Sequence, residues 1–171
     1  MTESSCAALC AGGGLRQCPV CGVRGESVER LTVAALTSGV VPPDQRYALC
    51  RQTDCEVVYF GEDGTVISGR RLNVVPGFKS RSPEALVCYC FQHRRADLEA
   101  ELAGCGTTTI PDRIAAEVKA GNCACEVRNP SGRCCLGDVQ EVIQKARALR
   151  GSRSAQKEQQ TLPGQIGTRP G

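Results

Sequence analysis

Tryptophan is absent from this sequence, and only three tyrosines and three phenylalanines occur among its 171 residues. Aromatic side chains supply the largest buried areas, so their scarcity argues against a large interdigitated core. Small cores with few aromatics usually need cross-links from disulfides or metals. The 13 cysteines are the obvious source of such links.

Long hydrophobic runs are also missing. No segment approaches the roughly 18 apolar residues of a membrane span. The short apolar stretch 6–11 has no basic region before it and is followed by glycines, so it does not resemble a signal peptide. We therefore expect a cytosolic protein, in which thiols stay reduced and patterned cysteines bind metals or carry out redox chemistry. An odd number of cysteines also fits poorly with a fully paired disulfide framework.

A strong charge of one sign is lacking as well. The formal net charge is +3, and two four-thiolate metal centres of about −2 each would make the loaded chain slightly negative. No arginine-rich block interleaved with aromatics indicates a nucleic-acid partner. No nucleophile–base pair, phosphate-binding glycine loop or open His/carboxylate metal site is visible, so we do not expect an enzyme.

Composition divides the sequence into five parts: a flexible leader (1–15), a β subdomain (16–75), a linker (76–83), a helical subdomain (84–150) and a disordered tail (151–171). The linker is PGFKSRSP, and the tail is rich in Gly, Ser, Gln, Lys and Pro. Residue patterns predict strands at 31–36 and 56–60, a hairpin turn at 61–64 and a return strand at 65–67. Apolar spacing predicts helices at 95–103, 110–120 and 137–149.

Four cysteines form a first group: Cys18, Cys21, Cys50 and Cys55. Two cysteine pairs beside predicted hairpin material are typical of a zinc ribbon, in which four thiolates surround one zinc ion. Such a closed site supports folding and leaves no open position for catalytic water. One alternative is a redox dithiol at the CxxC, which requires a helix directly after it, and none is predicted. Asp54 in place of one thiolate is the other alternative.

Six cysteines form a second group: Cys88, Cys90, Cys123, Cys125, Cys134 and Cys135. A CxC such as 88–90 strains the coordination of a single tetrahedral ion. It suits a [2Fe–2S] cluster, because each of the two irons takes two thiolates. Both parts of the group precede predicted helices, whose N-terminal dipoles and free amides favour a negative cluster. The alternatives are a second zinc site and buried cysteines without metal.

Polar residues near the second group could assist it. The turn sequence 129–132 (NPSG) could offer backbone N–H groups to a sulfide. Arg94, Arg95 and Arg133 could offset the charge of a cluster. His93, the single histidine, could act as a Rieske-like ligand, but the supply of cysteines makes this unnecessary and favours a polar surface histidine.

Three cysteines lie outside both groups. Cys6 and Cys10, four residues apart, could bind Cu(I) as an accessory pair, although the simpler interpretation is a disordered leader with incidental thiols. Cys105, in Gly104-Cys-Gly106, is predicted to be a spare thiol at a helix end.

Several strings, in this order, resemble the N-terminal domain of CopZ-type copper chaperones: CPVC (18–21), CEVVYF (55–60), VCYC (87–90) and NPSGRCC (129–135). The similarity runs from about residue 16 to residue 149. The second half is also similar to bacterioferritin-associated ferredoxin-like [2Fe–2S] domains, which are small and helical. The resemblance therefore implies an α+β fold, with a small zinc-ribbon-like β subdomain followed by a small helical [2Fe–2S] subdomain.

The resemblance also implies ligands: Cys18, Cys21, Cys50 and Cys55 for zinc, and Cys88, Cys90, Cys125 and one of Cys134 or Cys135 for the cluster. Cys123 could compete as a cluster ligand. The sequence departs from the full chaperone in lacking the Met-x-Cys-x-x-Cys motif of its copper domain, since its one methionine is Met1. This departure puts copper delivery by the usual route in doubt.

These patterns lead us to expect a one-electron redox protein linked to copper or metal homeostasis, with reduction of Cu(II) as a hypothesis. Its partner would be a copper carrier, a copper transporter or a redox protein, with neither nucleic acid nor membrane involved. One alternative is a chaperone or sensor that binds Cu(I) or passes on a cluster. The other is a structural double-zinc module for protein contacts.

Overall fold

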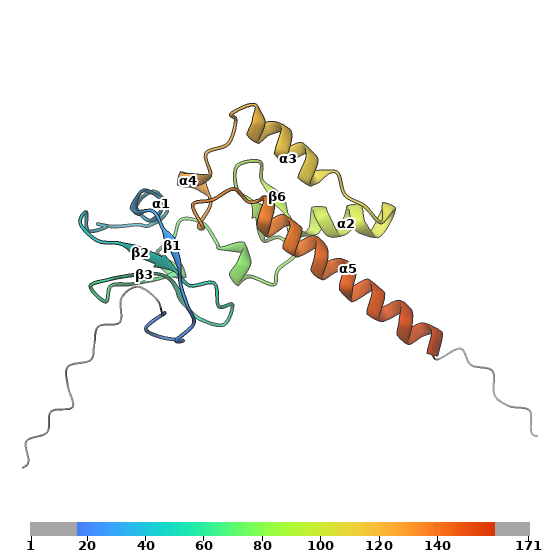
Figure 1. Ribbon diagram of the computed structural model, residues 1–171, viewed down its shortest axis with the longest axis horizontal. Coiled ribbons are helices and arrows are strands. Elements are labelled where there is room, and N and C mark those ends of the chain that lie inside the picture. The colour runs from blue at the N-terminus through green and yellow to red at the C-terminus, as the bar shows by residue number, and fades with distance from the viewer. Residues whose placement is uncertain (1–16, 160–171) are drawn as a thin grey trace, which may run out of the picture.

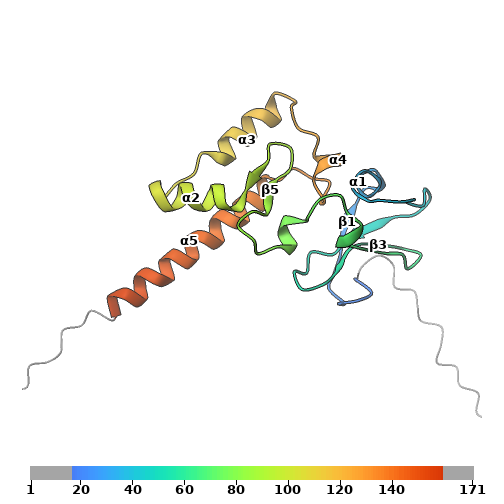
Figure 2. The same ribbon diagram turned by 180° about the vertical axis from the view of Figure 1, so that it is seen from behind.

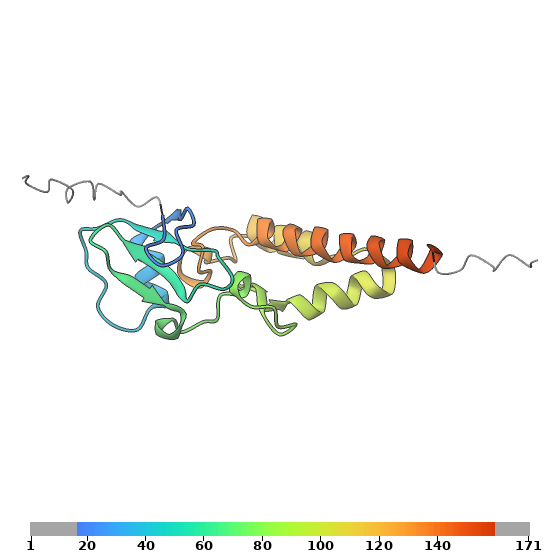
Figure 3. The same ribbon diagram turned by 90° about the horizontal axis from the view of Figure 1, so that it is seen from below.

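The computed structural model describes residues 17–159, with side chains as far as Gly151. The predicted leader, with Cys6 and Cys10, and residues 160–171 of the predicted tail lie outside this part. Figures 1 and 3 show a lobe built on a β-sheet and a lobe built on helices, arranged end to end. Within residues 17–159, no helix is both long enough and apolar enough to cross a membrane.

The sheet lobe contains a four-stranded antiparallel sheet in the order β1-β2-β3-β4. Its strands are β1 (Glu26–Val28), β2 (Tyr47–Leu49), β3 (Val57–Gly61) and β4 (Val66–Ser68). The predicted hairpin is confirmed, because β3 and β4 pair across a tight turn at 61–64. Gly64 has φ +86° in this turn, a conformation that glycine adopts without the steric cost of a Cβ.

The strand predicted at 31–36 is wrong, because these residues belong to helix α1 (Arg30–Leu36). Thr32, Val33 and Leu36 are buried while Leu31 is 56% exposed, so burial follows one helical face and does not alternate. A short apolar run cannot be assigned to helix or strand by periodicity alone. Helix α1 packs against α4 (Cys125–Arg128) of the other lobe.

The sheet separates two apolar groups. One contains Val28, Val33, Val41, Tyr47, Leu49, Val58, Tyr59 and Ile67. The other contains Cys18, Ala48, Cys50, Cys55, Val57 and Phe60. Strand β2 shows the alternation directly, since Tyr47 and Leu49 belong to the first group and Ala48 to the second. The four cysteines thus share one side of the sheet with Phe60.

The helical lobe begins with a short antiparallel pair, β5 (Leu86–Cys88) and β6 (His93–Arg94). Its helices are α2 (Arg95–Cys105), α3 (Ile110–Lys119), α4 (Cys125–Arg128) and α5 (Leu136–Gln159). The helices predicted at 95–103, 110–120 and 137–149 are confirmed. Their apolar faces meet in one core around Leu98, Ile114, Val139 and Ile143.

Helix α5 is longer than predicted. Part of the segment predicted to be a disordered tail, 151–159, continues this helix. Figure 2 shows α5 running beside α2 and then extending beyond it. Residues 151–159 include Ala, Arg, Gln, Lys and Glu, which have high helix propensity, so a mostly polar helix can extend past its packed part.

The two lobes are joined by specific polar contacts. Tyr59 on β3 donates a buried hydrogen bond to the Pro130 carbonyl at 2.8 Å. Gly132, with φ +66°, lies against Thr32 of α1, where an added Cβ would be 2.6 Å from Thr32 Oγ1. Arg133 donates to the Ser27 carbonyl at 3.2 Å. The NPSG turn is therefore an inter-lobe contact as well as a neighbour of Cys134 and Cys135.

Candidate metal centres

The first cysteine group is assembled by two turns beside the sheet. Cys18 and Cys21 lie in a knuckle in which Cys18 N donates to Val23 O at 2.8 Å and Gly22 N donates to Cys18 O at 2.9 Å. Gly22 has φ +71°, which lets the chain reverse within this knuckle. Cys50 follows β2 directly and Cys55 lies two residues before β3, so the sheet sets the spacing of the second pair.

The four sulfur atoms of this group all lie within 4.8 Å of one another. Cys18 Sγ is 3.9 Å from Cys55 Sγ, and Cys21 Sγ is 3.6 Å from Cys50 Sγ. Zinc bound to four thiolates at about 2.3 Å in a tetrahedron requires sulfur separations of about 3.8 Å. The donor set and its spacing therefore fit one tetrahedral zinc ion. Asp54 is not brought into the group: its side chain is 78% exposed and lies 3.9 Å from Arg81.

The thiols of the first group differ in acidity. A hydrogen bond from the Val23 backbone lowers the pKa of Cys21 to about 7. Burial raises the pKa of Cys50 to about 12 and also raises that of Cys55. Four thiolates packed this closely repel one another, and a bound dication removes that repulsion. Binding of a metal would thus release protons from this group.

The second group comes from three places in the helical lobe. Cys88 ends β5 and Cys90 follows in the turn, Cys125 begins α4, and Cys135 immediately precedes α5. Cys90 Sγ lies 3.6 Å from Cys125 Sγ. Cys88 pairs with Cys135, whose side-chain hydrogen bond lowers the pKa of Cys88 to about 7. The same pairing raises the pKa of Cys135, and burial raises that of Cys125 to about 12.

The two groups differ in arrangement. Among residues 17–159, the first group is the only set of three or more Cys, His or carboxylate side chains whose donor atoms all lie within 4.8 Å of one another. Within the second group, Cys90 Sγ lies 3.6 Å from Cys125 Sγ, and a side-chain hydrogen bond couples Cys88 to Cys135. Thiolates grouped two and two fit a [2Fe–2S] cluster, whose two irons take two thiolates each.

The remaining cysteines of the helical lobe are more accessible. Cys134 is exposed, whereas its neighbour Cys135 is 2% exposed and belongs to the core. Cys123 is half-buried. Cys105 is exposed at the last residue of α2, where Gly106 caps the helix with φ +72°. Cys105 is therefore at a helix end, as the sequence predicted.

Backbone N–H groups near the second group have two kinds of partner. Ala124 N donates to Cys90 Sγ at 3.4 Å. Within the turn, Ser131 N donates to Asn129 Oδ1 at 3.0 Å and Gly132 N donates to Asn129 O at 2.8 Å. These two amides are used inside the turn because the side chain and carbonyl of Asn129 close it.

The arginines expected to offset cluster charge make other contacts. Arg94 pairs with Glu84 at 2.7 Å, Arg133 binds the Ser27 carbonyl, and Arg95 Nη2 donates to the Ser80 carbonyl at 3.1 Å. His93 lies opposite Cys88 in the β5–β6 pair and is half-buried, with part of its surface exposed. Burial and the nearby Arg113 lower the pKa of His93.

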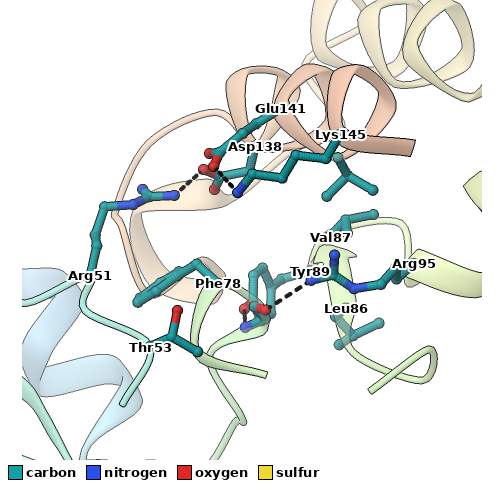
Figure 4. A pocket seen from close by; sticks show the side chains of 12 residues that line it. Arg51, Thr53, Phe78, Leu86, Val87, Tyr89, Arg95, Asp138, Glu141 and Lys145 are labelled. Carbon is teal, nitrogen blue, oxygen red and sulfur yellow. Dashed lines mark hydrogen bonds and ion pairs between the residues drawn. The ribbon is translucent and has the colours of Figure 1, made fainter. Parts of the chain in front are cut away.

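Sequence reasoning missed two cations near the first group. Lys79, in the short 3-10 turn η2 (Gly77–Lys79), approaches Cys50 Sγ at 3.9 Å. Arg51 binds Asp138 of α5, and its guanidinium carbon lies 4.7 Å from the centre of the Phe78 ring. The only sequence signal was the position of Arg51 directly after a candidate ligand. Figure 4 shows Arg51 reaching Asp138 in a pocket between the lobes, lined also by Tyr89 and Arg95.

Comparison with known proteins supports a zinc-binding domain in the first half of the chain. Residues 15–73 match the zinc-binding domain family of CopZ. The chain is 33% identical over 126 residues to the copper chaperone CopZ of Archaeoglobus fulgidus, and this match covers 71% of the chain and 58% of the relative. The chain thus spans little more than half the length of that relative.

The fold is also similar to a solved structure. The X-ray structure of the Archaeoglobus fulgidus CopZ N-terminal domain aligns with a TM-score of 0.58 and 28% identity, covering 74% of this chain and 96% of that one. A relative named as a copper chaperone agrees with the expectation of a non-enzymatic protein. In sequence and in its α+β fold, the chain is similar to the N-terminal domain of CopZ and contains a CopZ-like zinc-binding domain.

Proposed function

We propose that the chain is a cytosolic metal-binding protein that transfers single electrons in copper or metal homeostasis. Zinc occupies the first group, Cys18, Cys21, Cys50 and Cys55. A [2Fe–2S] cluster occupies Cys88, Cys90, Cys125 and Cys135. The observation that carries this proposal is the division of the second group into two sulfur pairs.

The proposed fourth cluster ligand is Cys135, which its burial favours over Cys134. Cys135 is 2% exposed and pairs with Cys88, whereas Cys134 is exposed to solvent. Cys135 also stands at the start of α5, where unpaired amides and the helix dipole favour negative charge. Cys134 is thus left as a free thiol beside the site.

Residues around the second site shield it from water and stabilise negative charge, as a redox centre requires. A bound [2Fe–2S] cluster supplies one-electron oxidation and reduction. Cys88 is fully buried and Cys125 is 7% exposed, so most of the site is shielded from water. The Ala124 amide places a positive dipole on Cys90 Sγ, which favours the reduced state with its additional negative charge. Cys90 is half-buried, so an electron-transfer partner would approach on its side.

Metal analysis of anaerobically purified protein tests this proposal. We expect about two iron, two sulfide and one zinc per chain, with visible absorption that bleaches when dithionite is added. Cys135→Ser should lose the colour, and the matched variant Cys134→Ser should keep it. Colourless protein with zinc alone would remove electron transfer and favour the double-zinc module.

A second candidate function is that of a metal chaperone, which carries Cu(I) or hands on a cluster. It is favoured by the similarity to a protein named as a copper chaperone and by Cys123 and Cys134, the more accessible thiols of the second group that the proposed cluster does not use. The partner would then be a copper carrier or transporter. Cu(I) titration against a chromophoric competitor tests this function. Wild-type protein should bind Cu(I) beyond its resident metals, and Cys123→Ser/Cys134→Ser should not.

A further inference from the structure

The segment between the lobes contacts both cysteine groups. It was expected to be a linker at 76–83, yet Pro76 and Gly77 are buried. Lys79 N donates to Pro76 O at 3.0 Å and Ser80 N donates to Gly77 O at 3.2 Å, which closes the turn η2. We call residues 76–80 the bridge segment.

One end of the bridge segment binds the first group through Lys79. Its ammonium donates to Gln52 O at 2.7 Å and to Cys55 O at 3.0 Å, and it lies 3.9 Å from Cys50 Sγ. Lys79 makes no ion pair with a carboxylate in the described part of the chain. A zinc ion with four thiolates has a net charge of about −2, so the loaded site attracts this ammonium more strongly than the neutral thiols do.

The other end of the bridge segment binds the CxC of the second group. Gly77 N donates a buried hydrogen bond of 2.6 Å to Tyr89 Oη, and Tyr89 is the residue between Cys88 and Cys90. A Cβ on Gly77 would overlap the Leu86 carbonyl, so the backbones approach too closely for any side chain. Arg95 Nη2 adds hydrogen bonds to Gly77 O and Ser80 O. Figure 4 shows Tyr89 and Arg95 converging on this segment.

From these contacts we infer that the bridge segment couples the two sites. Lys79 is a positioning residue that stabilises the zinc-loaded first group and fixes the bridge segment, and Gly77 then holds Tyr89 and the CxC in place. Zinc in the first group therefore orders Cys90 in the second. This inference rests on the proposed function in taking the first group as the zinc site. It adds that the zinc controls the neighbouring site as well as its own lobe.

The test uses the full, reduced, iron-free chain, so that it does not depend on a cluster. Zinc affinity is measured by competition with a chromophoric chelator. Iodoacetamide labelling of Cys90, followed by peptide mass spectrometry, is measured with and without one equivalent of zinc. The variants are Lys79→Met, Lys79→Arg and Tyr89→Phe. The matched control is Arg81→Met, which removes one exposed positive charge two residues away.

Zinc should slow the labelling of Cys90 in wild-type protein and in Arg81→Met. Lys79→Met should bind zinc about tenfold more weakly, the loss typical of an outer partner of a metal ligand, and should lose the slowing of Cys90 even at saturating zinc. Lys79→Arg should retain part of both effects. Tyr89→Phe should bind zinc with normal affinity, but zinc should no longer slow the labelling of Cys90 in this variant. A merely structural role for Lys79 would not separate zinc affinity from Cys90 labelling in this way.

Two results would overturn the inference. One is equal protection of Cys90 by saturating zinc in wild-type protein, Lys79→Met and Tyr89→Phe. The other is unchanged protection in Cys18→Ser/Cys21→Ser, which would mean that zinc acts directly at the second group. Wild-type protein that never acquires iron would contradict the proposed cluster and leave this assay readable, because the assay uses iron-free protein.

Discussion

The sheet lobe and the helical lobe gather their cysteines in different ways. In the sheet lobe, two turns anchored by adjacent strands bring four sulfurs within 4.8 Å of one another. In the helical lobe, the sulfurs come from the β5 turn, α4 and α5, and they meet in two pairs. The first arrangement depends on local turn geometry. The second depends on how three elements pack together, and so on the inter-lobe contacts that place α4 and α5.

The largest effect should follow from breaking the first group itself. Cys50→Ser removes a buried thiolate at the edge of the sheet, and we expect loss of zinc and unfolding of the sheet lobe. Structural zinc contributes roughly 10 kcal/mol to the folding of small zinc domains. Circular dichroism and zinc content measure the result. The matched substitution Cys105→Ser, at an exposed thiol, should change neither.

A smaller effect should follow from moving the lobes relative to each other. Gly132→Ala places a Cβ 2.6 Å from Thr32 Oγ1 at a residue with φ +66°. We expect a loss of about 1–3 kcal/mol in the free energy of unfolding, measured by urea denaturation. Gly137→Ala is the control, because an added Cβ there meets nothing within 4 Å in helix α5. Equal stability of both variants would show that the NPSG turn does not fix the lobes.

The smallest effect should come from one inter-lobe hydrogen bond. Tyr59→Phe removes the bond to the Pro130 carbonyl and should cost about 1 kcal/mol in the free energy of unfolding at pH 7. Ile67→Val, a conservative change elsewhere in the same core, serves as the comparison for stability. If Tyr59→Phe left the free energy of unfolding unchanged, the bond would be too weak to join the lobes.

Because Tyr59 is buried, we also expect the stability of the protein to depend on pH in the alkaline range. Burial raises the pKa of Tyr59, and burial also raises that of Tyr89 to about 12. A tyrosine whose pKa is higher in the folded protein than in the unfolded chain contributes to the free energy of unfolding. That contribution is complete below the unfolded pKa of about 10, and it is lost as the pH rises toward the folded pKa. Zinc-loaded protein should therefore lose stability between pH 10 and about 12. This decline should be smaller in Tyr59→Phe, as urea denaturation at each pH would measure.

Sequence patterns were sufficient to predict those elements whose conformation depends mainly on residues within the element. The β3–β4 hairpin and helices α2, α3 and α5 follow from strand-forming residues, turn glycines and apolar spacing within the segment. Helix α1 could not be predicted, because its short apolar run fits a helix and a strand equally well. Strands β1 and β2 have only three residues each and were missed for lack of a pattern.

The candidate sites, too, could be predicted only where local sequence spacing determines them. Cysteine spacing was sufficient to group Cys18, Cys21, Cys50 and Cys55, whose sulfurs the structure brings together. It could not separate Cys134 from Cys135, because adjacent residues differ only in the direction that packing gives them. The role of Lys79 could not be predicted from the sequence, since its contacts with Gln52 and Cys55 depend on tertiary structure.

The hydrogen bond from Tyr59 to Pro130 joins CEVVYF to NPSGRCC, two of the strings that carried the resemblance to CopZ. A gene fragment cut between the lobes would leave a phenol without its acceptor in one product and a carbonyl without its donor in the other. Recombination that exchanged one lobe for that of a distant relative would meet the same obstacle. In engineering either half, the Tyr59 donor and the Pro130 acceptor are therefore best kept together.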